Sequence, residues 1–130
     1  CGQVSLLFIT LCRISGIPAH FQSGFMMHPR AWNLHDWAEV YFEGVGWIPV
    51  DQSFGVPTFA RNADEEYFFF GGIDSWRMVV NNDYGMPLVP AKKYPRSETV
   101  DFQRGEVEWD GGNIYFPKWN YHMDIEYLNY

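Results

Sequence analysis

The sequence predicts an α+β fold in which a buried N-terminal helix packs on an antiparallel β-sheet. Residues 1–15 carry apolar side chains at the i, i+3, i+4 and i+7 spacing of a helix face. Residues 34–42 alternate two sets of side chains as a strand does, and a glycine-containing turn separates them from a second strand over 47–50. Aromatic residues make up 19% of the chain, which favours a core built from strands over a Leu-rich helical bundle.

Length and charge limit the possible classes of protein. We expect the 130 residues to form a single domain, 1–130. The formal net charge of -7, without a basic stripe, argues against a nucleic-acid partner or an anionic membrane surface. No apolar run approaches the roughly 20 residues of a membrane span, so we expect no membrane-spanning segment in these residues. The oligomeric state stays open.

The first helix is expected to start near Cys1 and to be buried on most sides. Its apolar face is formed by Val4, Leu7, Phe8, Leu11 and Cys12, and further apolar residues follow at Leu6, Ile9 and Ile14. Gly16 stands where a left-handed C-cap belongs, and Pro18 prevents the helix from continuing. Cys1 and Cys12 on one helix would be about 16 Å apart at 1.5 Å per residue, too far for a disulfide, so they are expected to be independent thiols.

A strand over 18–25 and a loop over 26–33 are expected to lead into the strand 34–42. A three-residue loop over 43–45 would pair Phe42 with Gly46. That register places Asp51 opposite Trp37 and therefore on the same face as His35, within reach of a hydrogen bond. A four-residue loop would turn Asp51 to the other face unless a bulge intervened.

The rest of the chain gives weaker signals. We expect a short helix or an acidic loop at 62–72, a strand at 74–83 and an extended or irregular tract at 84–97, which contains three prolines. Residues 106–116 are expected to form a hairpin around "DGG", and residues 121–130 are expected to form a last strand.

Three residues form a candidate for nucleophilic catalysis. A helix N-terminus stabilises a thiolate at Cys1, an imidazole such as His35 accepts and returns the thiol proton, and a carboxylate such as Asp51 orients that imidazole. Each residue also has an ordinary interpretation: a buried small hydrophobe for Cys1, a structural strand histidine for His35 and a turn former for Asp51. Trp32, Trp37 and Trp47 are candidates for the walls of a dry cleft or for the core.

The two runs "CGQVSLLFITLCRISGIPAH" and "LHDWAEVYFEGVGWIPVDQSFG" together resemble the transglutaminase-like family of the papain-type cysteine peptidase superfamily. In that family a Cys opens a buried helix that ends in Gly-Ile-Pro-Ala, a His precedes a strand ending in Glu-Val-Tyr, and an Asp follows Gly-Trp-x-Pro-Val. The resemblance covers about residues 1–55. It implies a papain-like, transglutaminase-like core with Cys1 as nucleophile, His35 as general base and acid, and Asp51 as the residue that orients His35.

The resemblance implies a cysteine peptidase or amidase that acts on protein or peptide amides through a thioester, as expected of microbial, including bacterial, members. Two alternatives remain: a protein-crosslinking acyltransferase, and a non-catalytic binding module that keeps the fold. We assign no cofactor and no metal, because His20, His28 and His122 lack metal-ligand spacing and no EF-hand type calcium loop is present. Residues 56–130 are expected to be a subgroup-specific extension.

The nucleophile of this family is residue 1 here. We expect the chain to be the C-terminal part of a longer protein, whose upstream residues complete the oxyanion hole, and we expect the chain alone to be weakly active or inactive. An N-terminal nucleophile hydrolase and a lipid-bearing cysteine of a bacterial lipoprotein are the alternatives. The compartment is open, with a preference for a periplasmic or secreted location.

Overall fold

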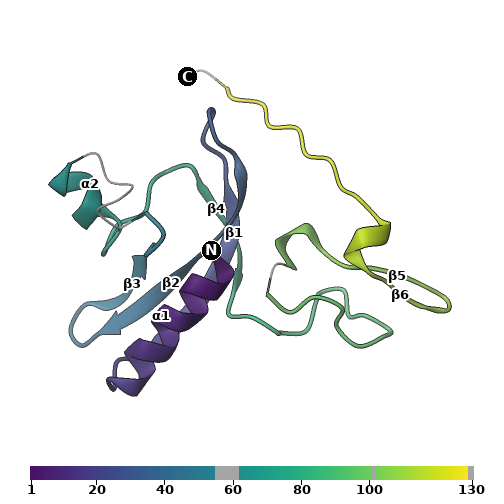
Figure 1. Ribbon diagram of the computed structural model, residues 1–130, viewed down its shortest axis with the longest axis horizontal. Helices are drawn as coiled ribbons and strands as arrows, with labels where there is room; N and C mark the ends of the chain where they lie inside the picture. The colour runs from purple at the N-terminus through teal and green to yellow at the C-terminus, as the bar shows by residue number, and fades with distance from the viewer. Residues whose placement is uncertain (55–61, 101, 129–130) are drawn as a thin grey trace.

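The computed structural model describes residues 1–54, 62–100 and 102–128. The helix α1 (Gly2–Ile14) lies against one antiparallel sheet, in agreement with the predicted α+β class (Figure 1). The sheet has the order β3-β2-β1-β4, from strands β1 (Ala19–Met26), β2 (Asn33–Phe42), β3 (Gly46–Val50) and β4 (Arg77–Asn82). The smaller elements are α2 (Ala63–Phe68), η1 (Phe102–Arg104), β5 (Val107–Trp109), β6 (Gly112–Ile114) and η2 (Phe116–Lys118).

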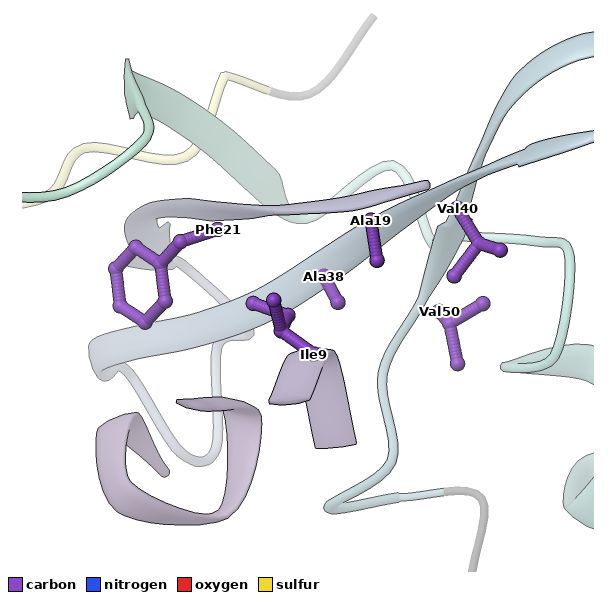
Figure 2. Packing of buried hydrophobic residues seen from close by; sticks show 6 residues of the cluster. All are labelled: Ile9, Ala19, Phe21, Ala38, Val40 and Val50. Atoms are coloured by element: carbon purple, nitrogen blue, oxygen red, sulfur yellow. The ribbon is translucent and has the colours of Figure 1, made fainter. Parts of the chain in front are cut away.

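The hydrophobic core lies between α1 and one face of the sheet. Ile9 projects from the helix toward the strands, as Figure 2 shows. The strands contribute alternate residues to this layer, namely Ala19, Phe21, Ala38, Val40 and Val50. Because successive side chains of a strand point to opposite faces, His35, Trp37 and Glu39 of β2 belong to the other face of the sheet.

The prediction that the helix is buried on most sides is wrong. Its buried residues are Gly2, Ser5 and Ile9, whereas Leu7 is 60% exposed and Ile14 is 77% exposed. A helix that packs on a single layer buries one stripe of its surface, and the first turns of that stripe carry the small residues Gly2 and Ser5 here. Apolar periodicity therefore located the helix but not the face that it buries.

The predicted register of the hairpin from β2 to β3 is confirmed. Phe42 pairs with Gly46, so residues 43–45 form a three-residue loop. Gly44 and Gly46 have φ of 79° and 104°, in a region that residues with a Cβ adopt only at a cost. Since Ala38 pairs with Val50, the next residue, Asp51, comes opposite Trp37 and on its face of the sheet.

The predicted strand over 74–83 is confirmed as β4, which pairs with β1 at the edge of the sheet opposite β3. The pairing shifts register between Ser23 and Gly24. A Cβ at Gly24 would lie 1.8 Å from the carbonyl oxygen of Met78, so the two backbones can approach this closely only because residue 24 is a glycine. This close approach brings the start of β4 toward the end of the sheet that carries His35.

An irregular stretch over 84–97 and the β5–β6 hairpin are both confirmed, and they lie together at one side of the molecule (Figure 1). The buried carboxylate of Glu106 holds the two segments together. It accepts hydrogen bonds from Lys92, from Arg96 Nε at 2.5 Å and from the backbone nitrogen of Ser97 at 2.8 Å. Burial by itself raises the pKa of Glu106, but these donors outweigh it and lower the pKa to about 2.

The two remaining predictions have different outcomes. Residues 63–68 form the helix α2, which decides between the helix and the acidic loop expected there. The prediction of a last strand over 121–130 is wrong, because residues 121–128 have no regular secondary structure. Residues 129–130 lie outside the described part of the chain. A strand needs a paired edge, and the long-range hydrogen bond of this tail is a side-chain bond instead, from the Tyr127 hydroxyl to the carbonyl oxygen of Met27.

Candidate active site

Cys1 is the N-cap residue of α1, as the sequence predicted, and it is exposed. Its sulfur donates a hydrogen bond to Asp36 Oδ2 at 3.1 Å. A pocket of about 360 Å³ opens beside it, lined by Cys1, Gly2, Gln3, Val4, Leu6 and Val100. A helix N-terminus favours a thiolate, but the carboxylate of Asp36 beside the sulfur opposes it, so the two influences on the thiol have opposite sign. Both cysteines are free thiols, as expected.

His35 and Asp51 are brought together at the end of the sheet. His35 Nε2 lies 2.7 Å from Asp51 Oδ2, and both residues are buried, with 7% and 1% of their surface exposed. A carboxylate that has lost its proton can only accept hydrogen bonds, so a neutral His35 must donate from Nε2. The second ring nitrogen, Nδ1, then carries a lone pair and can accept a proton.

Arg77 is a second partner of Asp51 that sequence reasoning missed. Its Nη1 donates to the same oxygen, Asp51 Oδ2, at 2.6 Å, and its Nε donates to Asp74 Oδ2 at 3.2 Å. The Arg77 side chain is only 2% exposed. Its guanidinium is surrounded by aromatic rings, with distances to the ring centroids of 5.6 Å for Trp37, 5.1 Å for Phe54 and 5.6 Å for Phe69.

The ionisation of Asp51 follows from these contacts. Burial alone raises the pKa of a carboxyl group, because it penalises the charged form. The hydrogen bonds and positive charges of His35 and Arg77 outweigh that penalty, so the pKa of Asp51 is lowered from its ordinary value of 3.8. Asp51 is therefore a carboxylate at neutral pH and accepts hydrogen bonds from both partners.

The three tryptophans have different environments. Trp37 is fully buried, and its ring lies beside His35 with the centroids 6.1 Å apart. Trp47 stacks flat on His20 at 4.2 Å, and Trp32 is about half exposed. Of the three, Trp37 is thus the one that forms a wall of the His35 site, together with Phe54, whose ring is 5.3 Å from that of His35.

Cys1 is held on the other side of the sheet from His35. Asp36 follows His35 directly in β2, so its side chain points to the opposite face, toward α1. There it binds Cys1 Sγ and accepts a hydrogen bond at 2.8 Å from Gln103 Nε2. Among the described residues, no hydrogen bond joins Cys1 to His35. The structure therefore brings together two of the three predicted residues and places the third beside a neighbouring residue of the strand.

Several polar residues around Asp36 were also missed. The hydroxyl of Ser5 donates to the carbonyl oxygen of Asp36 at 3.2 Å, and the side-chain amide of Gln52 lies 2.6 Å from that hydroxyl. Ser5, Asp36 and Gln52 all interrupt apolar patterns at positions that the register of the sheet and helix makes inward-facing. That interruption was the available signal. Arg77 and Gln103 carried no comparable signal, because both lie outside the segments with recognisable motifs.

The described residues show neither a metal-binding cluster nor a membrane-spanning helix. Across residues 1–54, 62–100 and 102–128, no cluster of three or more His, Cys, Asp or Glu side chains is arranged to hold a metal ion. In the same ranges no helix combines the length and the apolar character that crossing a bilayer would require.

A comparison with known protein families supports the relationship that the motifs indicated. Residues 1–52 match the family model of the transglutaminase-like superfamily. The matched segment contains α1 and β1 to β3, together with Cys1, His35 and Asp51. Comparisons with curated proteins and with solved structures gave no significant match. The predicted resemblance is thus confirmed for this N-terminal segment, and the match does not extend to β4 or to Arg77.

Proposed function

We propose, from the transglutaminase-like match of residues 1–52, that the protein is a cysteine peptidase or amidase that cleaves amide bonds of proteins or peptides. Cys1 is the nucleophile, His35 the general base and acid, and Asp51 the residue that orients His35. The observation that carries the proposal is the buried pair of His35 and Asp51 at 2.7 Å, in which His35 lies on β2 and Asp51 directly follows the adjacent strand β3 of the matched segment. An ionised Asp51 keeps the proton of a neutral His35 on Nε2 and leaves Nδ1 free to act as a base.

The proposed reaction has two halves. The Cys1 sulfur attacks the amide carbonyl while its proton passes to His35, and the resulting tetrahedral intermediate breaks its carbon–nitrogen bond as His35 returns the proton to the leaving amine. Water then attacks the thioester with His35 as base, and the carbon–sulfur bond breaks to release the acid and the thiol. The pocket beside Cys1 has space for part of the acyl group.

The proposal requires one change in the site. The thiol must leave Asp36 and reach Nδ1 of His35, because the hydrogen bond that it makes in this structure is to Asp36 Oδ2. Because Asp36 and His35 point to opposite faces of β2, the start of α1 must shift relative to the sheet for the sulfur of Cys1 to reach His35.

We further propose that residues 1–130 act as one domain with a papain-like core, and that residues 56–130 are an extension specific to a subgroup. Two contacts support this assignment. Arg77, from the later segment, binds Asp51, and Gln103 binds Asp36. The extension therefore supplies side chains to both faces of β2 next to the proposed site.

A hydrolysis assay on the protein at its full encoded length tests the proposal. Cys1→Ala and His35→Gln are expected to lower the rate of amide hydrolysis by at least about 10²-fold, since a positioned general base contributes 10² to 10⁴. The matched controls are Cys12→Ala and His20→Gln. Cys12→Ala removes the other thiol, and His20→Gln removes another strand histidine, whose Nε2 lies 2.6 Å from Oε2 of Glu39. Turnover that survives Cys1→Ala, or equal losses in His35→Gln and His20→Gln, would refute the assignment.

The contact between Cys1 and Asp36 favours a second candidate, a non-catalytic binding module that keeps the fold. Thiol alkylation separates the two. An active site predicts that iodoacetamide modifies Cys1 faster than an unperturbed thiol near neutral pH, and that His35→Gln slows this reaction. A Cys1 that reacts no faster than a free thiol, with no turnover at full length, supports the binding module. Release of the thioester to a lysine amine in preference to water would identify a crosslinking acyltransferase instead.

A further inference from the structure

We infer that Arg77 is a positioning residue of the site, which holds the Asp51 carboxylate in place so that Asp51 in turn holds His35. This inference rests on the proposed function, because it concerns the histidine that is the proposed base. It adds a residue from β4, outside the segment that matches the transglutaminase-like family. Three observations support this role: Arg77 and His35 bind the same oxygen of Asp51, the guanidinium of Arg77 is enclosed, and the sheet places Arg77 near Asp51.

Arg77 and His35 bind the same oxygen of Asp51. Nη1 of Arg77 and Nε2 of His35 lie 2.6 Å and 2.7 Å from the same atom, Asp51 Oδ2. The other oxygen, Oδ1, accepts the backbone N–H of Ser53 at 3.1 Å. With both oxygens engaged the carboxylate cannot rotate freely about its Cβ–Cγ bond, and the direction of Oδ2 toward His35 is fixed.

The guanidinium itself is held on all sides. Its Nε binds Asp74 Oδ2 at 3.2 Å, and the rings of Trp37, Phe54 and Phe69 surround it. A planar guanidinium suits such an environment, because it stacks on aromatic faces and can bind two carboxylates from different edges. Only 2% of the side chain is exposed, so water competes little for these contacts.

The sheet explains how a residue of the far edge strand reaches Asp51. Arg77 pairs with Met26 at the start of β4, and the register shift at Gly24 draws β4 against β1. Gly24 pairs with His35 and has no side chain. No side chain at position 24 therefore stands between β4 and His35 on β2.

The groups that determine the charge of Asp51 are few. Within the described part of the chain, the charged or titratable groups in contact with it are His35 from β2 and Arg77 from β4, and Asp74 acts on it through Arg77. Loss of Arg77 therefore leaves His35 as the one hydrogen-bond donor to Asp51 Oδ2 among those residues and removes the guanidinium charge beside the carboxylate. We expect the carboxylate to rotate more freely and to become protonated at a higher pH.

The test compares Arg77→Met and Arg77→Lys with the wild-type protein at full encoded length. The primary measurement is the ¹⁵N chemical shift of the two ring nitrogens of His35 at a pH where the imidazole is neutral, which reports the tautomer without needing activity. In Arg77→Met we expect a larger share of the Nδ1–H tautomer of His35. We also expect kcat to fall by about 10²-fold with little change in KM, and the acid limb of the pH–rate profile to move to higher pH. Arg77→Lys keeps the charge and loses the planar fork, so intermediate values are expected.

The control is Arg96→Met, which removes another largely buried arginine, one that binds Glu106 away from the site. It is expected to lower stability while leaving the His35 tautomer and the acid limb unchanged. A folded Arg77→Met with the wild-type tautomer and pH profile would overturn the inference and leave the proposed function standing. If Arg77→Met does not fold, wild-type values in Arg77→Lys overturn it equally. If the His35 tautomer shifts in Arg77→Met but the wild-type protein shows no turnover that depends on Cys1, the role of Arg77 is supported and the proposed function is refuted.

Discussion

Replacing Asp51 with asparagine removes the charge on which two buried side chains depend. His35 can still donate to an amide oxygen, but the guanidinium of Arg77, 2% exposed, is left without its closest anionic partner. Removing one member of a buried ion pair costs about 3 to 5 kcal/mol, because the remaining charge is uncompensated in a region of low dielectric. We therefore expect Asp51→Asn to lower the free energy of unfolding by that amount.

The expected change in melting temperature follows from the size of the chain. An unfolding entropy of about 2.1 cal/mol/K per residue over 130 residues is about 0.27 kcal/mol/K. A loss of about 3 to 5 kcal/mol then lowers Tm by about 11 to 18 °C, which calorimetry resolves easily. Urea unfolding measures the same loss at 25 °C, through a lower midpoint at an unchanged slope.

The pH dependence of this difference gives a second check. The pKa of Asp51 is lowered in the folded state from 3.8, so the stabilisation that it provides is fully present above that pH. It is lost as the pH falls through the folded pKa, where the wild-type carboxylate also loses its charge. The gap between wild type and Asp51→Asn should therefore be largest near neutral pH and should narrow in acid.

A control isolates burial from charge. Asp74 also binds Arg77, but 29% of its side chain is exposed, so Asp74→Asn is expected to cost less than about 1 kcal/mol. An Asp51→Asn loss as small as that of Asp74→Asn, or a loss independent of pH, would show that the buried pair of Asp51 and Arg77 does not stabilise the fold to this extent.

Three further outcomes are expected. Glu106→Gln should cost about 1 to 3 kcal/mol by urea unfolding, because charge-assisted hydrogen bonds are lost, and the cost should be full above about pH 4.5 and disappear as the pH falls through about 2. Gly24→Ala should destabilise the fold by about 1 to 3 kcal/mol or more, since the new Cβ would lie 1.8 Å from the Met78 oxygen, and wild-type stability in this variant would contradict the close approach of the strands. Ile9→Ala should cost about 2 to 5 kcal/mol in thermal unfolding, against less than about 0.5 kcal/mol for the exposed Leu7→Ala, and equal losses would contradict the observed helix face.

The fold was predictable where a local pattern has one physical solution. The alternation over 34–42 and the glycine turn fixed the β2–β3 hairpin, and the three-residue loop then determined that Asp51 lies on the His35 face. The helix was predictable as an element, but its orientation was not. Apolar residues surround it, so periodicity did not distinguish the exposed Leu7 from the buried Ile9. The strand expected over residues 121–130 is not formed, because residues 121–128 have no regular secondary structure.

The site shows the same division. His35 and Asp51 lie in motifs whose spacing is local, so their contact follows from one hairpin. Arg77 and Gln103 reach this region from 26 residues after Asp51 and 67 residues after Asp36. No local pattern relates those pairs, because their proximity depends on β4 joining the far edge of the sheet and on η1 packing near β1.

The sequence by itself determined the α+β class, the start of the helix at Cys1 and the register that unites His35 with Asp51, because each depends on interactions between residues close in the chain. Only the tertiary structure decided which stripe of α1 is buried, that the thiol of Cys1 contacts Asp36, and that Arg77 shares an oxygen of Asp51 with His35. These depend on how whole elements pack. A hydrogen bond between strands that are distant in the chain, or between a helix and a sheet, is set by the relative position of two elements, which no single segment of the sequence encodes.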